Sequence, residues 1–261
     1  MRADIYLFNS GNAKSRQNAK ILIESGNVVI DGKKITKPAF EIDELVEHTV
    51  EIINKSRFVS RGGEKLDFAL DKFNINVAGK TCIDVGASTG GFTDCLLQRN
   101  ANLVYAVDSG HSQLDPLIEN DERVVSIEKF NAKFMTKEDF EVEFDIAVMD
   151  VSFISQTLIH SAVYDVLKDG GVFISLIKPQ FECGKSALNS HGIVKKATHH
   201  RDAICKVIDN ALISGFSCED IVCSPIEGGS GNVEFLVCLR KSNNPQNYVN
   251  ENKIKLITHT K

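Results

Sequence analysis

The sequence predicts an α/β protein in which a small N-terminal α+β domain precedes a doubly wound, mainly parallel sheet. Three observations predict this class. From Lys80 onward, apolar β-rich runs alternate with helical segments, as expected for strands buried on both faces of a parallel sheet. A glycine-rich turn, DVGASTGGF, follows the first of these runs. The first 54 residues differ from the rest in charge and periodicity, which indicates a separate domain.

The composition is that of a globular protein. The chain has 261 residues, of which 43% are hydrophobic and 25% charged, and this excludes a disordered or fibrous protein. No stretch reaches the roughly 18 apolar residues of a membrane span, and the first residues lack the apolar core of a signal peptide. The seven cysteines have no CxxC spacing, so we expect reduced core thiols and no metal site. We therefore expect a cytoplasmic protein that has no membrane partner.

Charge is distributed unevenly along the chain. The formal net charge is −5, yet residues 1–37 hold seven basic and three acidic residues. Residues 38–54 hold five acidic residues and no Lys or Arg, and residues 55–65 are basic again. Such asymmetry favours a small basic domain joined to a larger acidic one, although a solvated charged face is the alternative.

Residues 1–54 are predicted to form the small domain. DIYLFNS and residues 15–25 place apolar residues at helical spacing, with Ser15 as the N-cap and Gly26 at the C-terminal end. The pair Asp31-Gly32 lies between two apolar runs, which is a strong hairpin signal. Residues 55–64, which are polar and contain glycine, are predicted to be a linker.

The larger domain is predicted over residues 65–240. It begins with a helix, LDFALDKF, and continues with helical segments near 91–99, 155–168 and 196–214. Five runs are predicted to be parallel strands: TCIDVG, LVYAVDSG, RVVSIEKF, FDIAVMD and GVFISLIKP. The last two runs, CEDIVCSPIEG and NVEFLVCLRK, have no helix between them, so we expect an antiparallel pair at the sheet edge. Residues 241–261 contain five Asn and are predicted to be a poorly ordered tail.

The turn DVGASTGGF indicates a ligand pocket. Its glycines allow tight backbone turns and close approach of a ligand, and they are Gly86, Gly90 and Gly91. Asp84 precedes the first glycine, and Asp108 ends the next strand, where a carboxylate can accept hydrogen bonds from ribose hydroxyls. Ser88 stands where dinucleotide enzymes have a second glycine, and no Walker-type lysine follows. The pattern predicts an adenosine-containing ligand.

Four charged residues interrupt apolar or glycine-rich surroundings. Lys65 follows SRGGE, Asp150 ends the run AVMD, Lys178 ends the run SLIK, and Glu234 lies near the start of the last strand. Ligands of open α/β sheets bind beyond the carboxyl ends of the strands, so Asp150 and Lys178 should lie side by side near the glycine turn. For each residue alone, an exposed strand end is the alternative.

The pattern D-x-G-x-S-x-G-G-F, with an acid ending the next strand, resembles the class I S-adenosylmethionine-dependent methyltransferases. The resemblance implies a seven-stranded Rossmann-like methyltransferase sheet with S-adenosylmethionine as cofactor. Asn131 falls where such enzymes contact the adenine, and a loop cap is the equal alternative for it. The cofactor-binding residues that the resemblance implies are Asp84, Gly86, Ser88, Gly90, Gly91, Phe92, Asp108 and Asn131.

The order Lys–Asp–Lys–Glu around this turn resembles the FtsJ-type ribose 2′-O-methyltransferases, and with the N-terminal domain it is similar to the TlyA family, also called haemolysin A. The motifs are SRGGEKL, DVGASTGGFTD, MDVSFIS, IKPQFE and GNVEF. The resemblance implies methylation of a cytidine 2′-hydroxyl in ribosomal RNA. Lys178 is the candidate base, Lys65 would orient the hydroxyl, and Asp150 and Glu234 would hold the lysines. The short arm before the first helix favours the small-subunit RNA.

The N-terminal domain resembles an RNA-binding domain first seen in a small-subunit ribosomal protein, which implies ribosomal RNA or a ribosomal subunit as partner. Three alternatives stay open: a membrane-active haemolysin, a non-catalytic RNA-binding protein on a methyltransferase scaffold, and a small-molecule O-methyltransferase. A haemolysin would need an apolar insertion element, which the sequence lacks, and a small-molecule enzyme would leave the basic domain unexplained. The expected RNA contacts are Lys14, Arg16, Lys20, Lys33, Lys34, Arg57 and Arg61.

Overall fold

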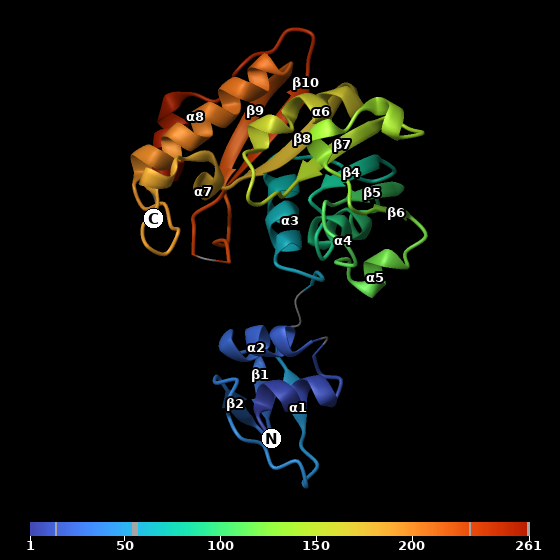
Figure 1. Cartoon of the computed structure of the whole chain (residues 1–261), viewed down its shortest axis with the longest axis vertical. Helices are drawn as coiled ribbons and strands as arrows, with labels where there is room; N and C mark the ends of the chain where they lie inside the picture. The colour runs from blue at the N-terminus through green and yellow to red at the C-terminus, as the bar shows by residue number, and fades with distance from the viewer. Residues whose placement is uncertain (14, 54–56, 230, 260–261) are drawn as a thin grey trace. The chain divides into compact units, whose positions relative to one another are not determined.

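A computed structural model describes residues 1–13, 15–53, 57–229 and 231–259 (Figure 1). The chain divides into two compact units, Met1–Arg57 and Phe58–Lys261. In the described part of the chain, no helix is long and apolar enough to cross a membrane.

The N-terminal unit packs two helices, α1 (Ala3–Asn9) and α2 (Arg16–Glu24), with a three-stranded antiparallel sheet. Ser15 caps α2, since its Oγ accepts a hydrogen bond from the Asn18 amide at 3.1 Å. Asp31 and Gly32 both have positive φ, +50° and +74°, which a two-residue hairpin loop requires. The predicted helix cap and hairpin are therefore confirmed. The strands lie in the order β2 (Lys33–Ile35), β1 (Val28–Ile30), β3 (Val50–Ile52).

The larger unit is built on a seven-stranded sheet, as the sequence predicts. Its order is β6-β5-β4-β7-β8-β10-β9, and β10 runs antiparallel to both of its neighbours. The reversal at β10 brings the start of that strand to the edge where the parallel strands end. The strands are β4 (Thr81–Val85), β5 (Leu103–Val107), β6 (Val124–Ile127), β7 (Phe144–Met149), β8 (Leu167–Ile177), β9 (Phe216–Cys223) and β10 (Phe235–Lys241).

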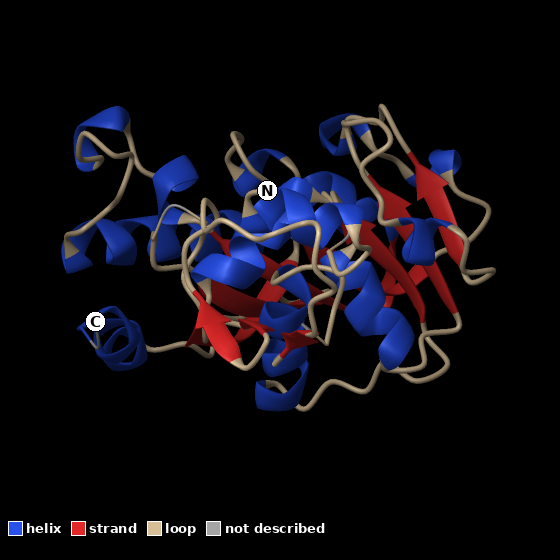
Figure 2. Ribbon diagram, turned by 90° about the horizontal axis from the view of Figure 1, so that it is seen from below, coloured by secondary structure: helices blue, strands red, loops and turns tan. Residues whose placement is uncertain are grey.

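Helices cover both faces of this sheet (Figure 2). Successive residues of β4 show the alternation, because Cys82 packs with Leu66 of α3, whereas Ile83 belongs to the core that contains Ile204 of α8. The helices are α3 (Gly62–Lys72), α4 (Gly91–Gln98), α5 (Pro116–Glu119), α6 (His160–Val166), α7 (Pro179–Glu182), α8 (Ala197–Ile213) and α9 (Glu251–His259). Four short 3₁₀ turns complete the elements: Ala132–Phe134, Lys137–Asp139, Gln156–Leu158 and Lys185–Ala187.

The predicted linker over 55–64 needs correction. Phe58 is buried in the larger unit, and the Val59 amide donates a hydrogen bond to Asp94 Oδ2 at 2.8 Å. Helix α3 already begins at Gly62. The polar composition of this stretch concealed one aromatic anchor, Phe58, which fixes residues 58–64 to the larger unit. Lys55 and residue 56 lie outside the described residues.

The prediction of a poorly ordered tail over 241–261 is wrong for residues 241–259. Strand β10 extends to Lys241, and α9 packs against α8 and β9. Ile254 and Thr258, one turn apart, are buried on the inner face of α9. The average hydrophobicity of this Asn-rich stretch does not reveal its narrow apolar face. One such face is enough to fix a helix of this length to a core.

Candidate active site

The glycine turn between β4 and α4 is as narrow as the sequence predicts. Gly86 has φ +84°, and a Cβ atom there would lie 2.7 Å from the backbone oxygen of Asp150. At Gly91 a Cβ would lie 2.1 Å from Ser60 Oγ. A side chain at Gly86 would therefore displace neighbouring backbone, and one at Gly91 would collide with the Ser60 side chain.

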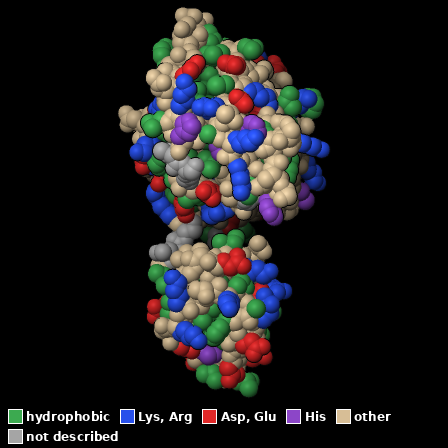
Figure 3. Space-filling model, turned by 90° about the vertical axis from the view of Figure 1, so that its left-hand side faces the viewer, with side chains coloured by type: hydrophobic (Ala, Val, Ile, Leu, Met, Phe, Trp, Pro, Cys, Tyr) green, Lys and Arg blue, Asp and Glu red, His purple; other side chains and the backbone are tan. Residues whose placement is uncertain are grey.

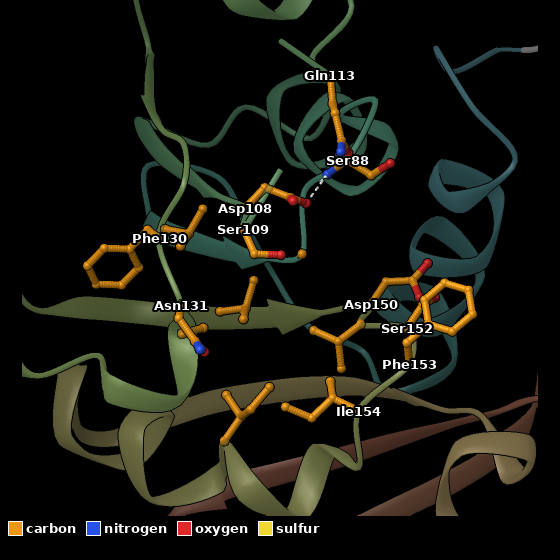
Figure 4. Close-up of a pocket in the computed structure, with 16 residues that line it drawn as sticks. Ser88, Asp108, Ser109, Gln113, Phe130, Asn131, Asp150, Ser152, Phe153 and Ile154 are labelled. Carbon is orange, nitrogen blue, oxygen red and sulfur yellow. Dashed lines mark hydrogen bonds between the residues drawn. The ribbon is translucent and has the colours of Figure 1, made fainter. Parts of the chain in front are cut away.

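Asp108, at the end of β5, fixes the turn from the other side. Its Oδ2 accepts a hydrogen bond from the Ser88 amide at 2.8 Å (Figure 4). Its Oδ1 accepts one from the Gly110 amide at 2.6 Å. Ser88 has a positive φ of +48° in this arrangement. The carboxylate thus holds the glycine turn and the loop after β5 in register, and it stands in the wall of a cavity.

The cavity beside Asp108 has a volume of about 500 Å³, within the range of small-ligand sites. Apolar side chains, among them Phe130 and Ile154, form part of its wall, and Figure 4 shows them with Asn131 and Asp108 around the cavity. Asn131 also caps a 3₁₀ turn, since its Oδ1 accepts from the Lys133 amide at 3.1 Å. Both predicted roles of Asn131 are therefore geometrically compatible.

Asp84 lies behind the turn and lines neither this cavity nor the smaller one beside it. The side chain is fully buried; Thr93 Oγ1 donates to Oδ2 at 2.7 Å, while Oδ1 has no hydrogen-bond partner among the described residues. Burial raises the pKa of Asp84 to about 7. Gly90 also lines neither cavity, whereas Gly91 and Phe92 line the smaller one.

The smaller cavity, about 270 Å³, adjoins the larger one. Four residues line both cavities and so form their common border: Gly86, Ser88, Asp150 and Ser152. The smaller cavity is lined in addition by Lys65 and Lys178. An apolar-walled compartment therefore opens beside a compartment that contains two amines.

Two lysine–carboxylate pairs meet at this place. Lys65 Nζ lies 2.5 Å from Glu234 Oε2, and both side chains are buried, with 8% and 3% of their surface exposed. Lys178 Nζ lies 2.5 Å from Asp150 Oδ1 and also donates to Ser152 Oγ at 2.8 Å. The structure thus brings together all four charged residues that the sequence singles out. It also shows the pairing, which the sequence left open.

The antiparallel β10 explains why Glu234 takes part. Phe235 pairs with Ile177 in the register of β10 and β8. Glu234, one residue earlier, therefore lies beside the segment that carries Lys178. The reversed direction of β10 thus places the Glu234 carboxylate at the carboxyl end of β8, where it pairs with Lys65 of α3.

A buried carboxylate that the sequence analysis missed connects the ends of β7 and β8. Glu182, in α7, has a side chain only 2% exposed. Its Oε1 accepts from the Gln156 amide at 2.8 Å, and its Oε2 accepts from Ser155 Oγ at 2.5 Å and from Lys206 Nζ at 3.0 Å. Glu182 thereby holds the loop that follows Asp150 against the helix that follows Lys178. Its place in the motif IKPQFE was the available signal.

The predicted RNA contacts belong to both units, and most of them lie in the N-terminal one. Arg16 and Lys20 lie one turn apart on α2, and Arg16 also approaches the buried Asp4 at 3.3 Å. Lys33 Nζ stands over the Phe40 ring at 4.8 Å, and Lys34 lies against Gly26. These side chains belong to the N-terminal unit.

The remaining predicted contacts lie elsewhere. Arg57 ends the N-terminal unit, and Arg61 lines the smaller cavity of the other unit. Lys14 lies outside the described residues. Arg2, which was not among the predicted contacts, donates from its Nε to Asp4 Oδ1 at 2.8 Å.

Residues 58–241 match the FtsJ-like methyltransferase family, and residues 1–45 match the S4 domain. The chain belongs to the FtsJ-like methyltransferase family. It is therefore an enzyme of the methyltransferase class, with an N-terminal S4 domain of the RNA-binding type. Membership indicates S-adenosylmethionine as the cofactor, and the two adjoining cavities and the side-chain-free turn at Gly86 fit such a molecule.

Known relatives share nearly the whole chain. It is 41% identical over 237 residues to "Hemolysin A" of Brachyspira hyodysenteriae, covering 90% of this chain and 98% of that protein. It is 40% identical over 239 residues to "16S/23S rRNA (cytidine-2'-O)-methyltransferase TlyA" of Mycobacterium tuberculosis, covering 92% and 89%. A solved structure from Streptococcus thermophilus, named as a hemolysin, is 42% identical with a TM-score of 0.80, covering 99% and 94% of the two chains.

Proposed function

We propose that this enzyme transfers the methyl group of S-adenosylmethionine to the 2′-hydroxyl of a cytidine in ribosomal RNA, with the small-subunit RNA as the preferred substrate. One observation carries the proposal: two amines, each paired with a carboxylate, line a compartment next to a cavity of nucleoside-binding character. The name of the mycobacterial relative supports the nucleotide and the position. The S4 domain supports an RNA substrate, and the name of the mycobacterial relative includes the 16S RNA of the small subunit.

The larger cavity would hold the adenosine part of the cofactor. Asp108, which already binds two backbone amides, presents its carboxylate where a ribose would lie, and Asn131 and Phe130 would border the base. Gly86 and Ser88 line both cavities, so the methionine part would pass in front of the glycine turn. When bound, the cofactor supplies an electrophilic methyl group.

Lys178 would accept the proton of the 2′-hydroxyl on its Nζ. Asp150 and Ser152 hold this amine at 2.5 and 2.8 Å, so its position is defined before the substrate arrives. Lys178 can accept this proton only as a neutral amine, so its ammonium form must first lose a proton to solvent.

Lys65 would orient the hydroxyl and stabilise the oxygen as it loses its proton. Its ammonium, held by Glu234 in a buried pair, supplies a fixed positive charge next to Lys178. Because the charge is preorganised, little rearrangement is needed during the reaction. In this proposal Lys178 transfers the proton, Lys65 orients the hydroxyl, and Asp150 and Glu234 position the two lysines.

The test is to incubate separated small and large ribosomal subunits with radiolabelled S-adenosylmethionine and to map the label. We expect incorporation at one cytidine of the small subunit. A 2′-O-methyl group should protect the adjoining phosphodiester bond from alkali, because the attacking hydroxyl is blocked. Label on a base atom would contradict 2′-O-methylation, and label confined to the large subunit would contradict the preference.

A further inference from the structure

Residues 183–201, between α7 and the first turn of α8, form the most basic segment of the catalytic unit. They contain four cationic residues and three His, and no Asp or Glu, in a chain whose net charge is −5. Neither the proposed chemistry nor the S4 domain uses this segment. We call its four cations the basic surface: Lys185, Lys195, Lys196 and Arg201.

These charges are available to a partner. Lys185, Lys195 and Lys196 are exposed and Arg201 is half-buried, and within the described part of the chain none of the four forms an ion pair. Other lysines of this unit behave differently, as Lys206 does with Glu182 and Lys168 with Asp145. Figure 3 shows the side of the larger unit that lies on the left in Figure 1, with Lys, Arg and His side chains at its surface and acidic ones among them.

Buried hydrogen bonds fix this segment next to the catalytic compartment. Asn232, only 1% exposed, accepts from the Val194 amide at 2.9 Å and donates to the Gly192 oxygen at 3.1 Å. Asn232 stands two residues before Glu234. At its other end, the segment follows α7, which begins directly after Lys178. The basic surface is therefore tied to the two chain segments that carry Lys178 and Glu234.

We propose that the basic surface binds the phosphate backbone of the RNA strand whose ribose enters the smaller cavity. This inference rests on the proposed function and adds an RNA-binding surface on the catalytic unit. A strand that presents one ribose to Lys178 must continue past the rim of the cavity, and its neighbouring phosphates need unpaired cations there. The surface offers such cations without base-reading geometry, so its contribution is independent of sequence.

An anionic membrane is the competing partner for a cationic surface. Peripheral membrane binding also needs apolar side chains that enter the lipid interface. Within residues 183–201, all of which the structure describes, no large hydrophobic side chain is exposed. The chemistry of this surface therefore favours RNA.

The experiment compares the variant Lys195→Glu/Lys196→Glu with the control Lys72→Glu/Lys80→Glu. The control changes the charge equally near the amino ends of the parallel strands, since Lys80 directly precedes β4 and Lys72 ends α3. Filter binding of the full-length proteins to purified ribosomal RNA is measured from 0.05 to 0.5 M salt, roughly the range in which phosphate contacts respond to screening. For the test variant, we expect the slope of log Kd against log salt concentration to decrease by about two. We also expect its affinity for RNA at low salt to fall by at least about tenfold. The control should bind like the wild type.

Equal affinity and slope in the two variants would overturn the proposal. So would unchanged RNA binding together with lost binding to vesicles that contain phosphatidylserine, because the surface would then belong to a membrane partner. Cofactor affinity, measured by calorimetry, should equal that of the wild type in both variants, since neither pair lies in the cavities beside the glycine turn. This experiment measures RNA binding and not methylation, so the two proposals are tested separately. If the wild-type protein methylated no RNA, the proposed function would be contradicted, while the binding data would still decide whether the basic surface contacts RNA.

Discussion

Each unit buries one aspartate completely, and the surroundings of the two aspartates shift their pKa values in opposite directions. Asp4, in the N-terminal unit, accepts hydrogen bonds from Arg2 and Arg16, and the Arg2 guanidinium holds the pKa of this carboxyl below its usual value. Asp84, behind the glycine turn, is bound by Thr93 and has no cation beside it among the described residues, and burial raises its pKa to about 7. The RNA-binding unit thus uses a buried carboxylate to hold surface arginines. The catalytic unit instead buries a carboxyl group that keeps its proton up to about pH 7.

The lysines of the active site and those of the basic surface also differ in whether a carboxylate holds them. Lys65 and Lys178 are held by carboxylates at 2.5 Å, whereas Lys185, Lys195 and Lys196 are exposed. A paired, positioned charge acts through geometry, so one substitution should remove its effect. Exposed charges act through their number, so each substitution should have a partial and salt-dependent effect.

The largest effect is expected at Lys178. Lys178→Ala should lower kcat for RNA methylation by at least about 10³-fold while cofactor affinity stays within a few-fold, because the loss falls on the transition state. Lys178→Arg should fail almost as badly, since guanidinium keeps the charge but does not release its proton near neutral pH. Single-turnover kinetics and calorimetry measure the two quantities. Substantial activity of the arginine variant would exclude Lys178 as the proton acceptor.

The two aspartates predict opposite effects on stability. The folded state holds a proton on Asp84 up to about pH 7, whereas an unfolded Asp ionises near 3.8, so folding loses stability as the pH rises between these values. Asp84→Asn should therefore stabilise the catalytic unit at pH 8 by up to ~4 kcal/mol and change little at pH 4. Asp4, with its lowered pKa, contributes stability above about pH 4 that is lost as the pH falls.

Asp4→Asn is the matched control, and it should destabilise the protein at pH 7 but not at pH 2. Calorimetric melting at several pH values measures both variants. If Asp84→Asn melted at a lower temperature than the wild type at pH 8, the carboxylate would be stabilising in its ionised form, and the comparison between the two aspartates would fail.

A smaller effect is expected at Glu182, which touches neither cavity. Glu182→Gln keeps the shape but weakens the acceptor for Ser155, Gln156 and Lys206. The loop that carries Ser152 should then hold Lys178 less well, and kcat should fall about tenfold while KM for RNA stays constant. Lys206→Met, which removes only the partly exposed partner, should have a weaker effect. An equal rise in KM, or a loss of folding without a change in kcat of the folded fraction, would assign Glu182 a purely structural role.

The smallest effect is expected in the S4 domain. Arg16→Ala/Lys20→Ala should lower RNA affinity by only a few-fold, because Arg16 is partly neutralised by Asp4 and Lys20 is half-buried. The slope of log Kd against log salt should decrease by less than two, since fewer than two full phosphate contacts are lost. Filter binding over a range of salt checks this. A loss as large as that expected for Lys195 and Lys196 would mean that pairing with Asp4 does not reduce the contribution of Arg16.

Much of the fold could be predicted because its signals are local. The alternation of apolar runs and helices predicts all seven strands, and Asp31-Gly32 predicts the hairpin. The elements that were mispredicted depend on one or two side chains. Phe58 fixes the start of the catalytic unit, and Ile254 fixes α9, although both stand in polar stretches.

The sequence predicted which charged residues form the candidate site, but it did not predict which of them pair with one another. Lys65, Asp150, Lys178 and Glu234 stand out because a charge beside an apolar strand or a glycine turn is unusual. That Lys65 pairs with Glu234, 169 residues away, follows only from the reversal of β10. Glu182 lies in the motif IKPQFE, but polar residues near strand ends are common, and it is burial that distinguishes Glu182 and Asn232 from the others.

The sequence by itself determined the succession of strands and helices, the narrow glycine turn and the kinds of side chain available for chemistry. These properties depend on residues that are close together in the chain, through backbone conformation and the period of burial. Only the tertiary structure decided which amine meets which carboxylate, which aspartate is left without a cation, and which polar side chains hold the loops. Those outcomes depend on desolvation and on distances of a few ångströms between segments far apart in the chain, and both arise when the sheet assembles.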